Sequence, residues 1–332
     1  MTQKDIDYYV QGVTGQNRLV MAKTITLIES TLPAHQETAR AVMDTLLPYT
    51  GKAVRLGITG VPGAGKSTFI ESFGMMLTKK GHRVAVLAVD PSSPRTGGSI
   101  LADKTRMEKL SVEERAFIRP SPSGGTLGGV ARKTRETMMV CEAAGYDVIM
   151  VETVGVGQSE VAVASMVDFF LVLMIAGAGD ELQGIKKGVL ELADAITVNK
   201  ADGDNVDRAK MARQQYETAM HLLSPPSPDW STPVLMCSSL TGTGLEEIWE
   251  TVLKHRKIVE EKGELERKRH EQSRLWMWAL VKEGLEGWFY KNAQVVNLLP
   301  LIEKEVVSGK ITATSGAARI LSFLQNYSLT ST

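Results

Sequence analysis

The chain is poor in the residues that hold disulfide-rich or metal-stabilised folds together. Among its 332 residues are only two cysteines, Cys141 and Cys237, and neither lies in a C-x-x-C pair or a Cys/His cluster. This argues against a disulfide framework and against a structural zinc site. Both cysteines are instead predicted to be small buried residues. The five histidines are scattered, without the spacing of metal ligands.

Charge of one sign and long apolar runs are also missing. The 38 basic residues balance 38 acidic ones, so no net field favours nucleic acid or an anionic membrane as a partner. The first residues contain no apolar signal core, and no stretch approaches the roughly 18 uncharged apolar residues of a membrane span. We therefore expect a cytoplasmic protein that binds neither nucleic acid nor membrane.

The central part of the chain alternates short apolar runs with longer helical patterns. This rhythm is typical of an α/β fold with a doubly wound, mostly parallel sheet, and continuous apolar strands fit a sheet covered on both faces. The expected strands are 54–59, 84–89, 147–151, 169–175, 195–198 and 234–236. Ligand-binding groups should lie just beyond the carboxyl ends of these strands.

Three domains are predicted. Residues 1–49 form a helical N-terminal extension, because apolar side chains recur there at helical spacing. Residues 50–258 form the sheet domain. Residues 259–332 form a helical C-terminal arm that begins with a charged run, 262–269, expected to be a solvated helix or linker. The arm carries several tryptophans and other aromatic residues that must be buried somewhere, which favours a homodimer contact over packing on the central domain.

A phosphate-binding loop follows the first expected strand and precedes a helical segment. Its glycines let backbone N–H groups point inward, and this strand–loop–helix setting is what a P-loop requires. Lys66 is expected to reach the terminal phosphates, and the Ser67 hydroxyl to help hold Mg²⁺. The predicted phosphate contacts are Gly60, Val61, Pro62, Gly63, Ala64, Gly65, Lys66, Ser67 and Thr68. The chain is therefore predicted to bind a nucleoside triphosphate.

The segment Asn199–Lys200–Ala201–Asp202, directly after another expected strand, predicts which base is bound. In an N-K-x-D arrangement the Asp202 carboxylate accepts two hydrogen bonds from guanine, and adenine cannot donate that pair. Asn199 and Lys200 are expected to brace the loop and cover the base. A later loop, with Ser238, Ser239 and Leu240, is expected to place a backbone N–H against the guanine oxygen.

Two further segments are expected to sense the γ-phosphate. Asp90, at a strand end, is predicted to hold a Mg²⁺-bound water or to orient the attacking water; the alternative is a turn residue before Pro91. Glu152 ends another strand and is predicted to contact Mg²⁺. Gly155 leaves room for a γ-phosphate, or is a simple turn glycine. Downstream, Lys186 is either a charge stabiliser in a mobile loop or part of an exposed polar loop.

With these elements in order, the chain resembles the GTPase chaperones of methylmalonyl-CoA mutase, the MeaB/ArgK-type family once labelled transport-system kinases. The motifs that carry the resemblance span almost the whole chain: GVPGAGKST, VDPSSPRTGGSILADKTRM, VETVGVGQSE, AGAGDELQGIKKG and NKAD.

The resemblance implies a homodimeric GTPase that binds Mg²⁺ and GTP or GDP. It also implies docking on the adenosylcobalamin-dependent mutase, where the chaperone gates cofactor loading and protects or reactivates the enzyme. By matching motifs, Asp90, Asp103 and Glu152 surround the metal, and Lys186 belongs to a third switch. No glutamine matches the water-orienting residue of Ras-like proteins, so slow intrinsic turnover is predicted.

Three other functions compete with this interpretation. A nickel-inserting GTPase shares the P-loop but usually carries His-rich or Cys-based sites. A kinase acting on a transport protein would prefer ATP, against the prediction for Asp202. A nucleotide-regulated scaffold would bind GTP without turnover.

Overall fold

A computed structural model describes residues 3–89, 107–120, 127–153, 159–177, 187–221 and 229–327. The chain forms two compact units, Met1–Arg269 and His270–Thr332, each described here by itself. The three domains inferred from the sequence remain a prediction, since the units group residues by contact and not by role.

Within the described residues, seven strands form one parallel sheet in the order β3-β2-β4-β1-β5-β6-β7. The strands are β1 (Val54–Gly60), β2 (Val84–Val89), β3 (Ala116–Arg119), β4 (Val148–Thr153), β5 (Phe169–Ile175), β6 (Ala195–Asn199) and β7 (Val234–Met236). β1 lies between β4 and β5, where the strand order reverses, so its carboxyl end opens onto the ligand crevice of a doubly wound sheet. The predicted α/β fold is confirmed.

All six expected strands are present, with ends shifted by at most two residues. The sequence missed β3, a four-residue strand at the edge of the sheet whose side chains are mostly half-buried. Its pattern is too short to separate from a loop by periodicity. It pairs with β2 from Val84↔Ala116 to Leu87↔Arg119.

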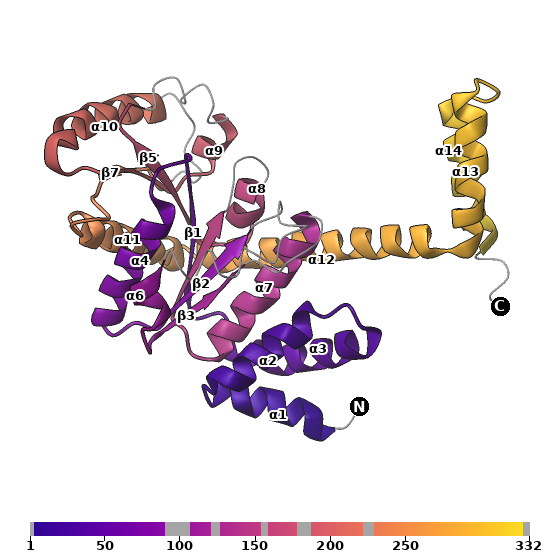
Figure 1. Cartoon of the computed structure of the whole chain (residues 1–332), viewed down its shortest axis with the longest axis horizontal. Helices are drawn as coiled ribbons and strands as arrows, with labels where there is room; N and C mark the ends of the chain where they lie inside the picture. Colours follow the sequence, from indigo (N-terminus) through magenta and orange to yellow (C-terminus); the bar gives the residue numbers. More distant parts are fainter. Residues whose placement is uncertain are drawn as a thin grey trace. The chain divides into compact units, whose positions relative to one another are not determined.

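Helices lie on both sides of the sheet; Figure 1 shows α4 and α6 on one side of the strands and α7 and α8 on the other. In the first unit the helices after β1 are α4 (Lys66–Lys79), α6 (Glu108–Ser111), α7 (Leu127–Ala143), α8 (Ser159–Ala164), α9 (Lys187–Glu191), α10 (Val206–His221) and α11 (Leu245–Glu261). They cover β2 and β4 completely, and every residue of both strands is buried. Cys141 and Cys237 are free and buried, as predicted.

The expected N-terminal helices are α1 (Gln3–Thr14), α2 (Arg18–Glu29) and α3 (Pro33–Leu46). Asn17 caps α2, because its side chain accepts hydrogen bonds from the N–H groups of Leu19 and Val20. α2 and α3 both pack against α7. The Arg119–Glu29 ion pair ties α2 to the end of β3.

The second unit continues α12 (Glu264–Lys291), which begins in the first unit, and adds α13 (Ala293–Val307) and α14 (Ala313–Tyr327). Across the residues that the structure describes, no helix is both long and apolar enough to cross a membrane.

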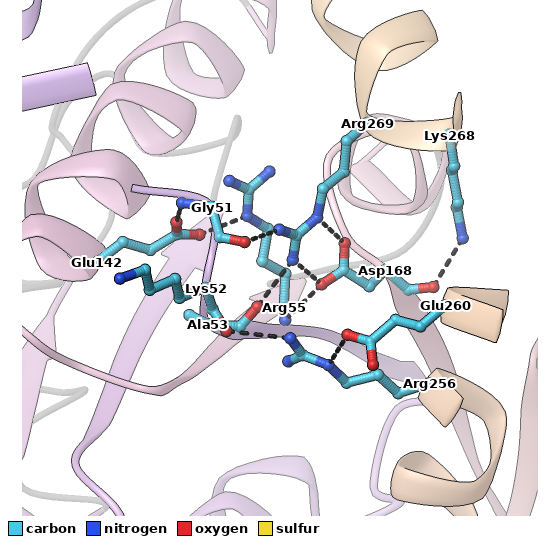
Figure 2. Close-up of polar contacts among 10 residues, drawn as sticks. All are labelled: Gly51, Lys52, Ala53, Arg55, Glu142, Asp168, Arg256, Glu260, Lys268 and Arg269. Atoms are coloured by element: carbon cyan, nitrogen blue, oxygen red, sulfur yellow. Dashed lines mark hydrogen bonds and ion pairs between the residues drawn. The ribbon is translucent and has the colours of Figure 1, made fainter. Parts of the chain in front are cut away.

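The charged run 262–269 was expected to be solvated, and for its last residue this is wrong. The Arg269 side chain is only 13% exposed and binds the Asp168 carboxylate at 2.6 Å. Arg269 also donates to the carbonyls of Gly51 and Ala53 (Figure 2). A guanidinium has five donors in a fixed fork, which lets one side chain meet a carboxylate and two carbonyls together.

Further contacts extend this cluster, which lies at the amino ends of β1 and β5 (Figure 2). Lys268 Nζ donates to the Asp168 carbonyl at 2.8 Å, and the Arg55 N–H donates to the Asp168 carboxylate at 2.9 Å. The Arg55 side chain in turn pairs with Glu142 of α7 at 2.5 Å. We call this cluster the basal network; its members are Arg55, Glu142, Asp168, Lys268 and Arg269. It fixes the first turns of α12 on the sheet edge opposite the carboxyl ends of the strands.

Candidate functional site

The loop after β1 folds as a strand–turn–helix junction. Gly65 has φ +83°, in the left-handed region that favours glycine, and it is the residue directly before α4. Gly60 approaches β5 so closely that a Cβ would lie 2.2 Å from the Leu173 carbonyl oxygen. The Ala64 N–H donates to the Val61 carbonyl at 3.1 Å. The N–H groups at the start of α4 thereby face the carboxyl end of the sheet, where an anion is favoured.

The Ser67 side chain, in the first turn of α4, lies beside the buried end of β4. The Ser67 hydroxyl is 3.4 Å from Glu152 Oε1, and Glu152 is only 6% exposed. A hydroxyl and a carboxylate oxygen side by side are the kind of donors that Mg²⁺ prefers. The described part of the site therefore fits a magnesium ion with Ser67 and Glu152 among its ligands.

The Lys66 ammonium group lies near the same Glu152 carboxylate. Its Nζ donates to the Gly60 carbonyl at 2.9 Å. Burial lowers the pKa of the Lys66 ammonium, and the nearby negative charges of Glu152 and Glu160 oppose that shift. A half-buried ammonium held on a carbonyl is poised to exchange that partner for phosphate oxygens.

Asn199, at the end of β6, connects the phosphate loop to the loop after β7. Its Nδ2 donates to the Ala64 carbonyl at 2.8 Å. Its Oδ1 accepts from the N–H of Ser239 at 3.0 Å and from the Ser239 hydroxyl at 2.9 Å. The Cys237 thiol, whose pKa burial raises to about 12, lies 3.4 Å from the same oxygen. One buried amide thus holds both loops in a single arrangement.

The predicted base-reading residues meet at this point. The Ser238 hydroxyl donates to Asp202 Oδ2, which orients the carboxylate. Lys200 has φ +60°, uncommon for a residue with a side chain, and strain of this kind is concentrated at functional sites. The Ala201 N–H holds the loop by donating to the Cys237 carbonyl at 3.0 Å. Leu240 extends from the second loop and is 82% exposed.

Several predicted residues lie outside the described part of the chain. These are Asp90, Asp103, Gly155 and Lys186. Their roles as metal ligands, γ-phosphate sensor and charge stabiliser stay predictions. Among the residues that are described, no group of three or more histidine, cysteine, aspartate or glutamate side chains is gathered for a metal ion.

The sequence interpretation missed Glu160 as a member of the site. It is buried in the first turn of α8, and its charge acts on the Lys66 ammonium. Its place in the motif VETVGVGQSE was a signal, but nothing in the motif alone distinguishes a site acid from an exposed one. The sequence also gave no sign that Asn199 reaches Ala64, since 135 residues separate them.

Comparison with known proteins agrees with this geometry. The family model described as "Methylmalonyl Co-A mutase-associated GTPase MeaB" matches residues 21–294. A Caulobacter vibrioides protein whose name describes it as a GTPase is 55% identical over 96% of this chain and 97% of its own length. GTPase ArgK of Escherichia coli is 47% identical over 93% of each chain. A crystal structure titled "LAO/AO transport system kinase" has a TM-score of 0.79 and 38% identity, covering 98% of this chain and 99% of the other.

The matched segment contains the P-loop, the N-K-x-D segment and the loop after β7 described above. The chain therefore belongs to the methylmalonyl Co-A mutase-associated GTPase (MeaB) family, and it is a GTPase that binds GTP and GDP.

Proposed function

We propose that the chain is a GTP-hydrolysing chaperone in the cytoplasm. It docks on adenosylcobalamin-dependent methylmalonyl-CoA mutase, gates loading of the cofactor, and protects or reactivates the enzyme. The observation that supports this most strongly is the double contact of Asn199, which links the phosphate loop to the loop after β7 in a member of this family. The loop after β7 is called the base-reading loop below. Binding of the nucleotide to one loop therefore affects the conformation of the other loop.

In this proposal each described residue has a separate task. Asp202, oriented by Ser238, accepts the two hydrogen bonds of guanine. Lys66 leaves the Gly60 carbonyl and stabilises charge on the terminal phosphates. Ser67 and Glu152 hold Mg²⁺, which neutralises charge on the phosphate oxygens when it is bound.

The second unit suits a homodimer contact. Four large apolar side chains recur on α12 at intervals of three and four residues, so they share one face of the helix. They are Trp278, Val281, Leu285 and Trp288. They are 57%, 42%, 61% and 43% exposed. An apolar stripe at this spacing is what a second helix packs against, and a second copy of the chain supplies one.

The test is recovery of the partner from cell extract. The full chain, loaded with a non-hydrolysable GTP analogue, is expected to retain a cobalamin-dependent mutase, and the same chain loaded with GDP to retain a different amount. The matched control is Asp202→Asn, which keeps the size of the side chain but reverses its hydrogen-bonding polarity. It is expected to lose retention with the GTP analogue.

Other results identify the competing functions. Stoichiometric nickel binding without mutase recovery would indicate a metal-inserting protein. Transfer of phosphate from ATP to a protein would indicate a kinase. Tight GTP binding with no GDP released in the presence of the mutase would indicate a scaffold.

A further inference from the structure

A pocket of about 490 Å³ lies beside the base-reading loop, on α4. Its walls come from the last two turns of α4, from α6, and from the segment that joins the loop after β7 to α11. Of the predicted nucleotide contacts, only Leu240 is part of its lining. The volume is within the range of sites that hold a small organic molecule.

The lining is cationic on one side. Lys79 is the last residue of α4, Lys80 follows it, and Lys109 lies on α6. Among the described lining residues these three cations are opposed by one carboxylate, Glu71. Lys80 pairs with Glu246 of α11, outside the lining. Glu71 accepts a hydrogen bond from the Lys109 backbone N–H at 2.7 Å. In the described part of the chain the Lys79 and Lys109 ammonium groups form no ion pair, so the lining keeps a net positive charge after the Glu71 carboxylate is counted.

The rest of the lining is apolar and adaptable. Met75 and Met76 are half-buried, and Leu245 is a buried lining residue. Methionine is unbranched and polarizable, so it packs well against flat apolar or aromatic groups of different shapes. A ligand with an apolar body and an anionic group matches both sides of the pocket.

The pocket is connected to the nucleotide site by hydrogen bonds. The hydroxyl of Ser72, a lining residue, donates to the Ser239 carbonyl at 2.6 Å. Ser239 is the residue whose N–H and hydroxyl are held by Asn199. A molecule that contacts Ser72 is therefore connected by two hydrogen bonds, through Ser239, to Asn199, which links the base-reading loop to the phosphate loop.

We propose that this pocket binds a small organic anion with an apolar body, and that its occupation changes the rate at which the guanine nucleotide is released. This effector site is separate from the phosphate and base contacts, and it goes beyond the proposed docking on the mutase. Occupation acts through Ser72 on the base-reading loop.

The probe for the test is 8-anilinonaphthalene-1-sulfonate, which joins an aromatic body to one sulfonate. The full chain is labelled with ¹³C at its methionine methyl groups, and the Met75 and Met76 signals are assigned with Met75→Leu and Met76→Leu. We expect saturable shifts of these two signals. Lys79→Gln with Lys109→Gln is expected to weaken binding about 3- to 10-fold, since each exposed charge contributes modestly.

Two controls separate this site from other apolar surfaces. Lys23→Gln with Lys254→Gln removes two exposed charges outside the lining and should leave the affinity unchanged. N-phenyl-1-naphthylamine, which has the same rings without the sulfonate, should bind the wild type and the Lys79/Lys109 variant equally. Unmoved Met75 and Met76 signals, or equal sulfonate affinity in the two double variants, would overturn the site.

The coupling has its own measurement. Saturating probe is expected to change the rate of GDP release at least 2-fold in the wild type and not in Ser72→Ala, which removes the hydrogen bond to Ser239. Binding without any change in GDP release would refute the coupling. Because binding is read from methyl signals without nucleotide, its failure is distinct from failure of the proposed mutase docking.

Discussion

Replacing Arg269 with methionine tests whether the arm begins as part of the GTPase unit. Methionine keeps much of the side-chain volume but leaves the Asp168 carboxylate, 8% exposed, without its cation. Removing one partner of a buried ion pair typically costs about 3–5 kcal/mol of unfolding free energy. We take the upper half of that range for Arg269, because its carbonyl contacts to Gly51 and Ala53 are lost as well.

The matched control is Arg256→Met, on the neighbouring helix α11. Arg256 pairs with Glu260 at 2.6 Å, but the Glu260 side chain is 47% exposed, and exposed pairs contribute about 0–1 kcal/mol. Urea unfolding of the full chain, followed by circular dichroism, compares the two variants. A midpoint for Arg269→Met no lower than that for Arg256→Met would refute the reasoning.

The pH dependence and a second substitution check the physical cause. Burial alone raises the pKa of Asp168, but the hydrogen bonds and charge of Arg269, helped by Arg55, hold it below its ordinary value of 3.8. The stability contributed by this pair is therefore fully present above pH 3.8 and lost as the pH falls through the folded-state pKa. In Arg269→Met the buried carboxylate loses that help, so adding Asp168→Asn is expected to restore part of the lost stability at pH 7.

The remaining predictions concern the nucleotide, the arm and a buried histidine. Lys66→Ala is expected to abolish GTP hydrolysis without changing the urea midpoint; full GTPase activity would contradict its role. A chain ending at Gly263 lacks Lys268 and Arg269 of the basal network and is expected to unfold at lower urea than a chain ending at Ser273, with both monomeric in sedimentation. Burial lowers the pKa of His255 below 6.5 although Asp194 opposes the shift, so unfolding free energy should fall as the pH drops below 6.5, and His255→Phe should lack that slope.

The fold could be predicted from the sequence because its central strands are continuous apolar runs between turn residues. That signal fails for β3, where Ala116–Arg119 is short and lies at the sheet edge. It also fails for Arg269, since a charged run predicts solvent exposure and only the tertiary structure brings Asp168 to it, 101 residues away. A charged side chain is buried only where a partner of opposite charge is present. When that partner is distant in the sequence, the local sequence pattern does not identify it.

In the candidate site, too, local motifs could be predicted from the sequence and tertiary contacts could not. The P-loop and the N-K-x-D segment could be located because each has a fixed local spacing whose chemistry is known. The link between them could not, because it depends on Asn199 meeting Ala64 and Ser239 across the sheet edge. The role of Glu160 likewise depends on its burial near Lys66, which a linear motif does not report.

The most direct test of the central claim is calorimetric titration of the wild type and Asp202→Asn with GDP, ADP and xanthosine diphosphate. We predict that the wild type binds GDP far more tightly than ADP, and that Asp202→Asn prefers xanthosine diphosphate, because the amide donates where the carboxylate accepted. Preference of the wild type for ADP, or an unchanged preference for GDP in Asp202→Asn, would contradict the account.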